Sequence, residues 1–268
     1  MTDAATTVQA RPLIKRLPVF SPVAVKLLAL VGDERIAFKE VAKLFSLDPL
    51  LAGKVLQLAN SGLYGRRYPV QSVLHAVAVL GLKDITRIAI TAALSSGLPR
   101  DTSPWIRSWW RHSLASAIIA DHVGLRDLDL DFGYTAGLLH AVGVLALFRN
   151  DPEGYAHLAD SAAAEGRDLF DLERDRYGFD HAQLSGLALA EWGIPENLQQ
   201  AVSQYCFSDA PDALTSAAQA GCAYAEAGGF DLCGCSHVPA SSINGKPLDQ
   251  HLLTVLATQV NLIECGLV

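Results

Sequence analysis

The stretch from Leu47 to Gly65 reads LDPLLAGKVLQLANSGLYG and predicts one helix with clear signals at both ends. Asp48 can accept a hydrogen bond from the free amides of a first turn, and Pro49 fits the first helical position, where its missing N–H costs nothing. The residues that follow place an apolar face near helical spacing: Leu50, Leu51, Val55, Leu58 and Ala59. Asn60-Ser61-Gly62 then ends the helix, because Asn and Gly tolerate left-handed backbone and can satisfy the last carbonyl groups.

The same combination of a cap, an apolar face and a stop recurs along the chain. No stretch alternates between apolar and polar residues with period two, so we expect an all-α fold. The nearly apolar run from Phe132 to Phe148 predicts a buried central helix. The other expected helices are 22–31, 38–45, 72–80, 84–94, 104–123, 152–165, 168–177, 180–192, a short one ending at Tyr205, 213–227 and 248–265.

The best internal boundary is the segment GLPRDTS at 97–103, which combines loop formers, a proline and cap-type residues. It predicts two lobes within one chain. We expect a flexible N-terminus over residues 1–13, an N-terminal helical lobe over 14–98 and a C-terminal helical lobe over 104–268.

Composition restricts the class of protein. The chain has 268 residues, of which 50% are hydrophobic, and a net charge of −7, which argues against binding to nucleic-acid phosphates. The N-terminus lacks the apolar segment of a signal peptide, and no apolar run is long enough to span a membrane. The five cysteines are an odd number, which favours reduced thiols, so we expect a cytoplasmic protein. Cys233-Gly-Cys235-Ser-His237 is interpreted as a loop rather than a zinc hook, because zinc sites favour wider ligand spacing.

The motif Asp-Pro-x-Leu followed by Lys-Val-Leu-x-Leu-Ala-Asn-Ser-x-x-Tyr-Gly resembles the signature of HDOD domains. These domains are helical output and interaction modules of bacterial signalling, distantly related to HD-type metal phosphohydrolases. The resemblance extends to Leu17-Pro18, Ser21-Pro22, VLHAVAVLGL at 73–82 and Gly137–His140, and covers residues 14–210. It implies an HDOD-like N-terminal lobe packed on an HD-like C-terminal lobe. The signature residues are Asp48, Pro49, Asn60, Ser61, Tyr64 and Gly65.

The resemblance also suggests where remnants of a metal site would lie. HD-type hydrolases use a histidine on one helix, a His-Asp dipeptide on the next, further histidines and a late aspartate. The carboxylate matters because it can bridge two cations that generate hydroxide and hold a phosphate. In this chain His112, His140 and His181 match three of the histidines and are the remnant ligand candidates.

The departures from that ligand set are severe. Ala141 follows His140, and a methyl group cannot ligate a metal. Ser203–Cys206 stands where active relatives have a paired histidine, and the segment LTSAAQAGCAYA has no carboxylate before Glu226. Three scattered imidazoles could still hold a transition metal weakly, but we favour hydrogen-bonded core histidines. We therefore expect no catalytic residue, no metal and no cofactor.

The first functional hypothesis is a non-catalytic regulatory module of bacterial signal transduction. It would act by protein–protein interaction, or by changing shape when a small ligand such as a nucleotide enters a remnant cleft. Its partners would be signalling proteins, with no role for membranes or nucleic acid. The alternatives are a metal-dependent phosphohydrolase or cyclic-nucleotide phosphodiesterase with altered ligands, and a nucleotide-binding sensor without turnover. Ala141 and the missing late ligands argue against the enzyme.

Overall fold

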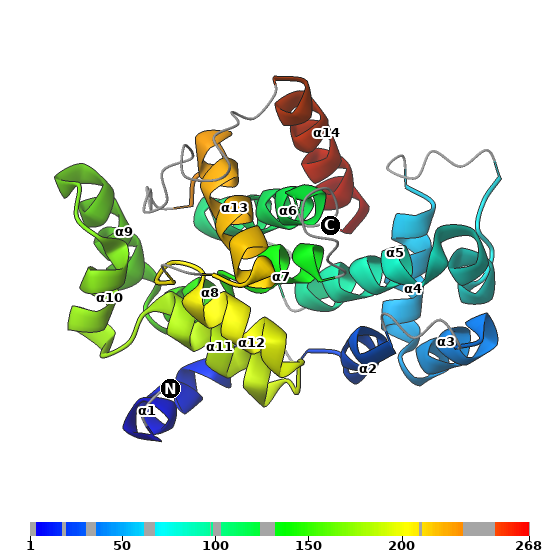
Figure 1. Ribbon diagram of the computed structural model, residues 1–268, viewed down its shortest axis with the longest axis horizontal. Helices are drawn as coiled ribbons and strands as arrows, with labels where there is room; N and C mark the ends of the chain where they lie inside the picture. The colour runs from blue at the N-terminus through cyan, green and yellow to red at the C-terminus, as the bar shows by residue number, and fades with distance from the viewer. Residues whose placement is uncertain are drawn as a thin grey trace. The chain divides into compact units, whose positions relative to one another are not determined.

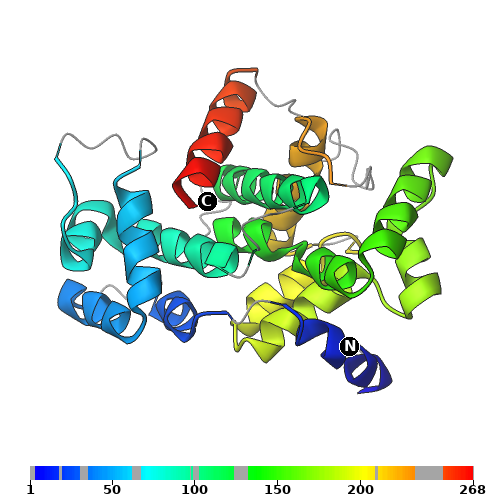
Figure 2. The ribbon, with the colours of Figure 1, turned by 180° about the vertical axis from the view of Figure 1, so that it is seen from behind.

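The computed structural model describes residues 4–17, 20–30, 36–61, 68–96, 98, 103–123, 132–208, 211–232 and 250–267. Every regular element in these ranges is a helix, which confirms the all-α prediction (Figures 1 and 2). No helix in this part of the chain is long and apolar enough to cross a membrane.

The helices follow one another closely along the chain. In order they are α1 (Ala4–Ile14), α2 (Pro22–Leu30), α3 (Phe38–Leu44), η1 (Phe45–Leu47), α4 (Pro49–Ala59), α5 (Val73–Ser96), α6 (Pro104–Val123), α7 (Gly133–Leu139), α8 (Val142–Asn150), α9 (Pro152–Glu165), α10 (Leu169–Tyr177), α11 (His181–Glu191), α12 (Glu196–Gln204), α13 (Ala213–Ala227) and α14 (Gln250–Leu267).

The chain divides into two compact units. Unit 1 contains Met1–Leu17 and Asp101–Leu256, and unit 2 contains Pro18–Arg100 and Ala257–Val268. The expected lobes differ from these units at both ends of the chain. Residues 1–13 were expected to be flexible, but α1 packs against α8 and α11 and buries Ala10 and Leu13. Apolar side chains buried against other helices stabilise this segment, which the polar first residues of the chain did not suggest.

Unit 2 is organised around α5, which packs against α2, α3 and α4 (Figure 1). The predicted helices 72–80 and 84–94 both lie within this element. Gly81, with φ of +80°, marks the kink between them, and a residue with a Cβ adopts that backbone conformation poorly. The core of the unit consists of buried apolar side chains from all four helices: Leu27, Leu28, Val41, Val55, Leu58, Ile85 and Ile88.

The signature residues of the Leu47–Gly65 stretch hold unit 2 together. Asp48 caps α4 by accepting a hydrogen bond from the backbone N–H of Leu51 (3.0 Å). The Ser21 hydroxyl at the start of α2 also donates to Asp48 (2.8 Å), so one carboxylate joins the beginnings of two helices. Asn60 follows α4, and its side chain bonds both backbone groups of Val70, at 2.7 and 2.9 Å. Tyr64 and Gly65 lie outside the described residues.

Asn60 ends α4 as predicted, but through a side-chain hydrogen bond and not through a left-handed backbone conformation. Its backbone has φ of −95°, so it is not left-handed. Instead its side-chain amide donates to the Leu56 carbonyl (2.8 Å), which also accepts the Asn60 backbone N–H (3.1 Å).

Unit 1 has two centres of packing. Helix α6 contacts α7 and α13, and α11 contacts α8 and α12, while α9 packs against α10 (Figure 2). The predicted single helix from Phe132 to Phe148 is wrong, because the chain bends at His140–Ala141 between α7 and α8. The indole N–H of Trp109 donates to the Ala141 carbonyl (2.8 Å) at this bend. Both short helices are buried, as the apolar run predicted.

Candidate functional site

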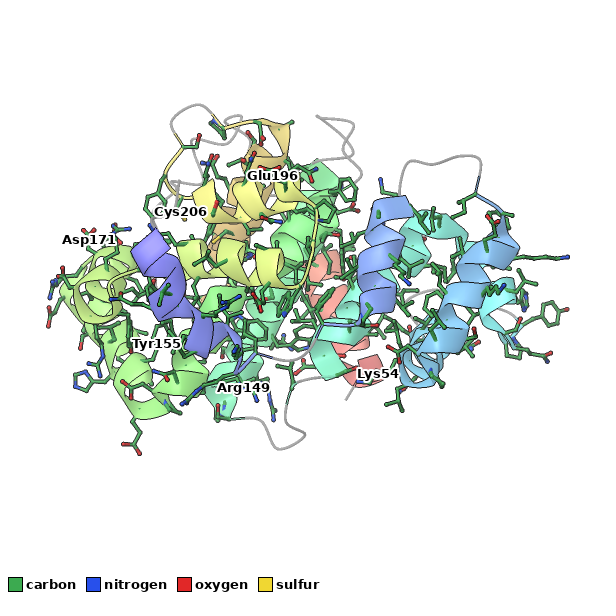
Figure 3. The ribbon with its side chains drawn as sticks, turned by 90° about the horizontal axis from the view of Figure 1, so that it is seen from below. Lys54, Arg149, Tyr155, Asp171, Glu196 and Cys206 are labelled. Atoms are coloured by element: carbon green, nitrogen blue, oxygen red, sulfur yellow. The ribbon has the colours of Figure 1, made fainter. Side chains whose placement is uncertain are left out.

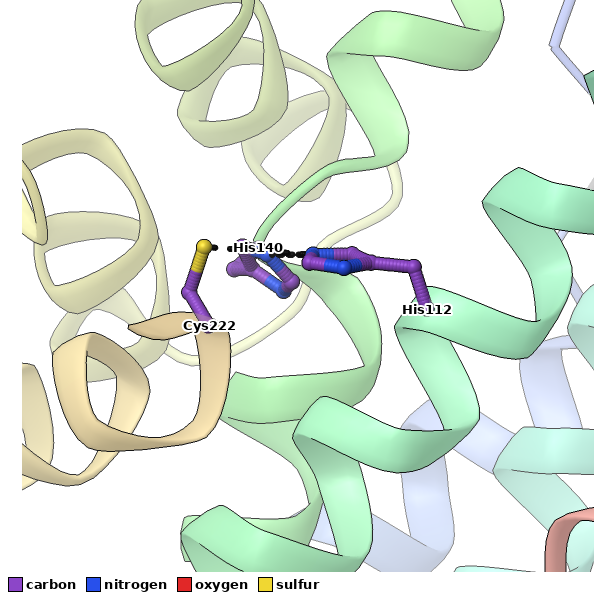
Figure 4. A group of neighbouring side chains, drawn as sticks. All are labelled: His112, His140 and Cys222. Atoms are coloured by element: carbon purple, nitrogen blue, oxygen red, sulfur yellow. Dashed lines mark hydrogen bonds between the residues drawn. The ribbon is translucent and has the colours of Figure 1, made fainter. Parts of the chain in front are cut away.

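Three buried side chains from different helices meet in unit 1. His112 comes from α6, His140 from the residue after α7, and Cys222 from α13 (Figure 4). Their exposed fractions are 1%, 0% and 9%. The two imidazole rings and the thiol point toward one another, and one ligand atom from each lies within 4.8 Å of the others.

Glycines allow the three helices to approach one another at this point. A Cβ on Gly137 of α7 or on Gly221 of α13 would collide with the backbone carbonyl of Ser116 on α6. Ser116 is one turn after His112, and Cys222 follows Gly221 directly. The close approach of α7 and α13 to α6 therefore brings His140 and Cys222 to His112.

Both imidazoles are oriented by backbone carbonyl groups. His112 Nδ1 lies 2.7 Å from the Phe230 carbonyl oxygen, and His140 Nδ1 lies 2.7 Å from the Gly137 carbonyl oxygen. A carbonyl oxygen only accepts, so in each ring Nδ1 carries the proton. The Nε2 atoms then face each other at 3.1 Å. His112 Nε2 also lies 3.4 Å from Ser116 Oγ and 3.8 Å from Cys222 Sγ.

The electrostatics of this cluster favour neutral side chains. Burial lowers the pKa of His112 to about 4, despite the hydrogen bond to Phe230 and the negative charge of Asp231. Burial, together with the nearby His112, lowers the pKa of His140 well below its ordinary value. Burial also raises the pKa of the Cys222 thiol well above its ordinary value, and the adjacent Glu226 adds to that effect.

His181 does not join this cluster but forms a second polar group with Glu173. Glu173 has an exposed fraction of 0% and accepts hydrogen bonds from the Tyr155 hydroxyl, the His181 backbone N–H and His181 Nδ1. The two carboxylate oxygens lie 2.9 and 2.7 Å from Nδ1. Tyr155, which is labelled in Figure 3, belongs to α9, and Glu173 belongs to α10, so the group connects this pair of helices to α11.

The charge of Glu173 decides the protonation of His181. Burial acts to lower the pKa of His181, but the negative charge and hydrogen bond of Glu173 outweigh it, so the pKa is raised. In the charged ring both N–H groups donate, Nδ1 to Glu173 and Nε2 to the hydroxyl of Tyr205 (2.9 Å). The Tyr205 ring also meets His140 edge to face, with centroids 5.0 Å apart. Tyr205 therefore separates His181 from the His112–His140 pair.

The residues do not fit the two-metal centre of HD-type hydrolases. The side chain at 141 is a buried methyl group at the N-cap of α8, and it offers no lone pair. Within Ser203–Cys206, the buried Tyr205 hydroxyl is bonded to His181. The group of ligand atoms found in the described part of the chain contains two imidazoles and a thiol, without the bridging carboxylate that two cations need.

Sequence reasoning missed three residues that shape these groups: Cys222, Glu173 and Tyr205. Cys222 lies on α13, where only the lack of a carboxylate was considered. A thiol is also a metal-binding group, so its presence in this helix was a usable signal. Glu173 and Tyr205 gave no local signal, because their partner His181 is reached only through tertiary packing. The segment Cys233–His237 lies outside the described residues.

Known structures share this arrangement of helices. An HDOD domain protein of unknown function from Geobacter sulfurreducens is 21% identical, with a TM-score of 0.74 over 98% of this chain and 97% of that one. A Shewanella amazonensis SB2B protein, named provisionally as a phosphohydrolase, is 22% identical with a TM-score of 0.69, over 97% of this chain and 98% of that one. A Marinobacter aquaeolei VT8 protein, named provisionally as a signal transduction protein, is 23% identical with a TM-score of 0.70. The match covers 98% of this chain and 65% of the Marinobacter chain.

These similarities show that the chain has an all-helical fold shared with an HDOD domain protein. The family model of the HDOD domain matches residues 17–206, so the chain belongs to the HDOD domain family. This confirms the resemblance seen in the Leu47–Gly65 stretch. No curated protein sequence matches the chain.

Proposed function

We propose that this HDOD protein is a non-catalytic regulatory module of bacterial signalling, which acts by binding other proteins or by changing shape when a small ligand binds. The observation that carries the proposal is Ala141, a buried methyl group directly after the central histidine His140. Two-metal phosphoester hydrolysis needs a carboxylate at such a centre to bridge and neutralise the cations. The HDOD family assignment and the name of the Marinobacter protein support a signalling role.

The surface of unit 2 supports an interaction role. Leu47 and Leu50 flank the capping residue Asp48 and are 66% and 83% exposed. They are adjacent to the beginning of α4, which the Asp48 hydrogen bonds to Ser21 and Leu51 hold in place. A pair of exposed leucines on a fixed helix end is suited to contact a partner protein, since apolar area can be buried there at a low cost in backbone ordering.

A turnover assay tests the non-catalytic half of the proposal. The purified protein, loaded in turn with Mn²⁺, Fe²⁺ and Zn²⁺, is incubated with bis(p-nitrophenyl) phosphate and with a cyclic dinucleotide. We expect no hydrolysis above that of the metal ions alone. Saturable turnover that disappears in His140→Ala would overturn the proposal and favour the metal-dependent phosphohydrolase, for which the name of the Shewanella protein gives a precedent.

Cross-linking in the native cell tests the interaction half. We expect the wild-type protein to cross-link to a reproducible set of proteins, and the double variant Leu47→Ser/Leu50→Ser to lose them. The matched control is Val8→Ser, which removes a 72% exposed apolar side chain from α1 in unit 1. An unchanged set in the double variant would show that the leucines do not form the partner surface.

A further inference from the structure

We propose that His112, His140 and Cys222 form a mononuclear site for a zinc-class transition metal ion, bound through two imidazole Nε2 atoms and one thiolate. This site goes beyond the proposed regulatory function and does not depend on it. It also differs from the two-metal centre excluded above, because it needs no bridging carboxylate and no ligand from His181. All three ligands belong to unit 1.

The two imidazole rings face each other in an unfavourable arrangement. Each Nδ1 donates its proton to a backbone carbonyl, so in the neutral rings both Nε2 atoms present lone pairs. Two lone pairs 3.1 Å apart repel each other, and no hydrogen atom is available on either ring to join them. A metal ion between the rings relieves this repulsion by accepting both lone pairs.

The distances between the ligand atoms are close to those around a tetrahedral zinc ion. Two ligands about 2.0–2.1 Å from a tetrahedral zinc ion lie about 3.3 Å apart, and a nitrogen and a thiolate sulfur at about 2.3 Å from the ion lie about 3.6 Å apart. The Nε2 atoms of His112 and His140 are 3.1 Å apart, and Cys222 Sγ is 3.8 Å from His112 Nε2. Both distances are within about 0.3 Å of the tetrahedral values, and the third pair of ligand atoms, from Cys222 and His140, lies within 4.8 Å.

The groups around the ligands hold them in a metal-binding orientation. Histidines that bind metals almost always donate their other ring N–H to a carbonyl or carboxylate, which fixes the ring and its tautomer. The carbonyl groups of Phe230 and Gly137 do this for His112 and His140. The glycine contacts at the Ser116 carbonyl fix the helices that carry the ligands. The site is thus oriented before an ion enters.

The donor set selects the class of ion. Imidazole and thiolate suit Zn²⁺, Co²⁺ and other late transition metals, whereas Mg²⁺ and Ca²⁺ require oxygen ligands. A bound cation also stabilises the thiolate form of Cys222. Three protein ligands leave a fourth position open. The Glu226 carboxyl group lies beside the site, with Oε1 4.0 Å from Cys222 Sγ.

Cobalt titration of the chelator-treated protein tests the site. We expect one Co²⁺ per chain, with a thiolate-to-cobalt charge-transfer band and the intense visible bands of a tetrahedral ion. Cys222→Ser should remove the charge-transfer band, and Cys222→Ser and His140→Gln should each weaken binding at least about tenfold, the loss typical even of outer-shell partners. Binding of Co²⁺ to Cys222→Ser with the wild-type spectrum and affinity would overturn the proposal.

Matched controls separate this site from other cysteines and histidines. Cys206→Ser changes a half-buried thiol of the same unit, and His157→Gln changes an exposed histidine of α9. The paired variant Cys233→Ser/Cys235→Ser removes the two thiols that are separated by one residue in the sequence. All three controls should bind Co²⁺ as the wild type does, and loss of the charge-transfer band in any of them would overturn the assignment.

X-ray absorption of the zinc-loaded wild-type protein gives a test that depends on no variant. We expect one sulfur at about 2.3 Å and nitrogen ligands at about 2.0–2.1 Å. A first shell of nitrogen and oxygen alone would exclude Cys222 as a ligand and overturn the proposal.

Discussion

The substitution Glu173→Gln should strongly destabilise unit 1. Glu173 is fully buried, and its two carboxylate oxygens accept from three donors: the Tyr155 hydroxyl, the His181 backbone N–H and His181 Nδ1. A glutamine keeps one oxygen but replaces the other with an NH₂ group, which faces a donor. Breaking a buried ion pair by removing one partner costs ~3–5 kcal/mol, a large part of the ~5–15 kcal/mol that stabilises a typical domain.

The effect should depend on pH in a defined direction. The pKa of His181 is raised in the folded protein, because Glu173, with Asp180 and Asp168, outweighs burial. The stabilisation from the charged ring is therefore fully present below the ordinary pKa of about 6.5 and is lost as pH rises through the raised value. Without the Glu173 charge, burial lowers the pKa of His181, and the variant loses stability as pH falls below about 6.5. The difference in the free energy of unfolding between the wild type and Glu173→Gln should therefore be larger at pH 6 than at pH 8.

Urea unfolding followed by circular dichroism at pH 6 and pH 8 measures these differences. The matched control is Asp175→Asn, which neutralises an exposed carboxylate on the same helix and should change the free energy of unfolding by less than about 0.5 kcal/mol. Two outcomes would contradict this prediction: Glu173→Gln lowers the free energy of unfolding no more than Asp175→Asn does, or it lowers it more at pH 8 than at pH 6. Either would show that Glu173 and His181 do not form a charged buried pair.

Three further predictions concern the stability of the folded protein and are checked by urea unfolding or thermal melting, both followed by circular dichroism. Leu58→Ala, in the core of unit 2, should leave a cavity and cost ~2–5 kcal/mol, and a wild-type melting temperature would contradict the placement of α4. Gly137→Ala should cost ~1–3 kcal/mol, because its Cβ would meet the Ser116 carbonyl, whereas Gly53→Ala on the exposed side of α4 should stabilise by ~0.4–1 kcal/mol. Equal effects of the two alanines would show that α7 does not approach α6 as described. Ala141→Asp should lower the melting temperature, since burying a carboxylate outweighs the ~1 kcal/mol gained from an N-cap, and should yield no phosphoester turnover. A Mn²⁺-dependent rise in melting temperature together with turnover would show that only this residue silences an enzyme.

Local signals in the sequence determined most helix bounds. Caps, prolines and apolar spacing are short-range features, and they located α6, α9 and α13 at the residues where the structure has them. The signature that placed the chain in the HDOD family lies in one stretch, and its Asp48 cap is itself a local interaction. The prediction of a single helix over 132–148 was wrong for a reason that lies in the tertiary structure. An apolar run carries no mark of a bend, and the bend at Ala141 lies where the Trp109 indole bonds its carbonyl.

The chemistry of unit 1 was decided only by the tertiary structure. His112 and His140 were found as candidates from the family resemblance, but their partner Cys222 is more than eighty residues further along the chain than His140. Its position depends on how closely α13 approaches α6, which a glycine contact at the Ser116 carbonyl sets. His181 was grouped with the other two histidines by sequence, and a buried carboxylate on α10 placed it elsewhere. Helix packing brings together ligand atoms that no local pattern connects, because each helix encodes its own turns but not the side chains that will face it.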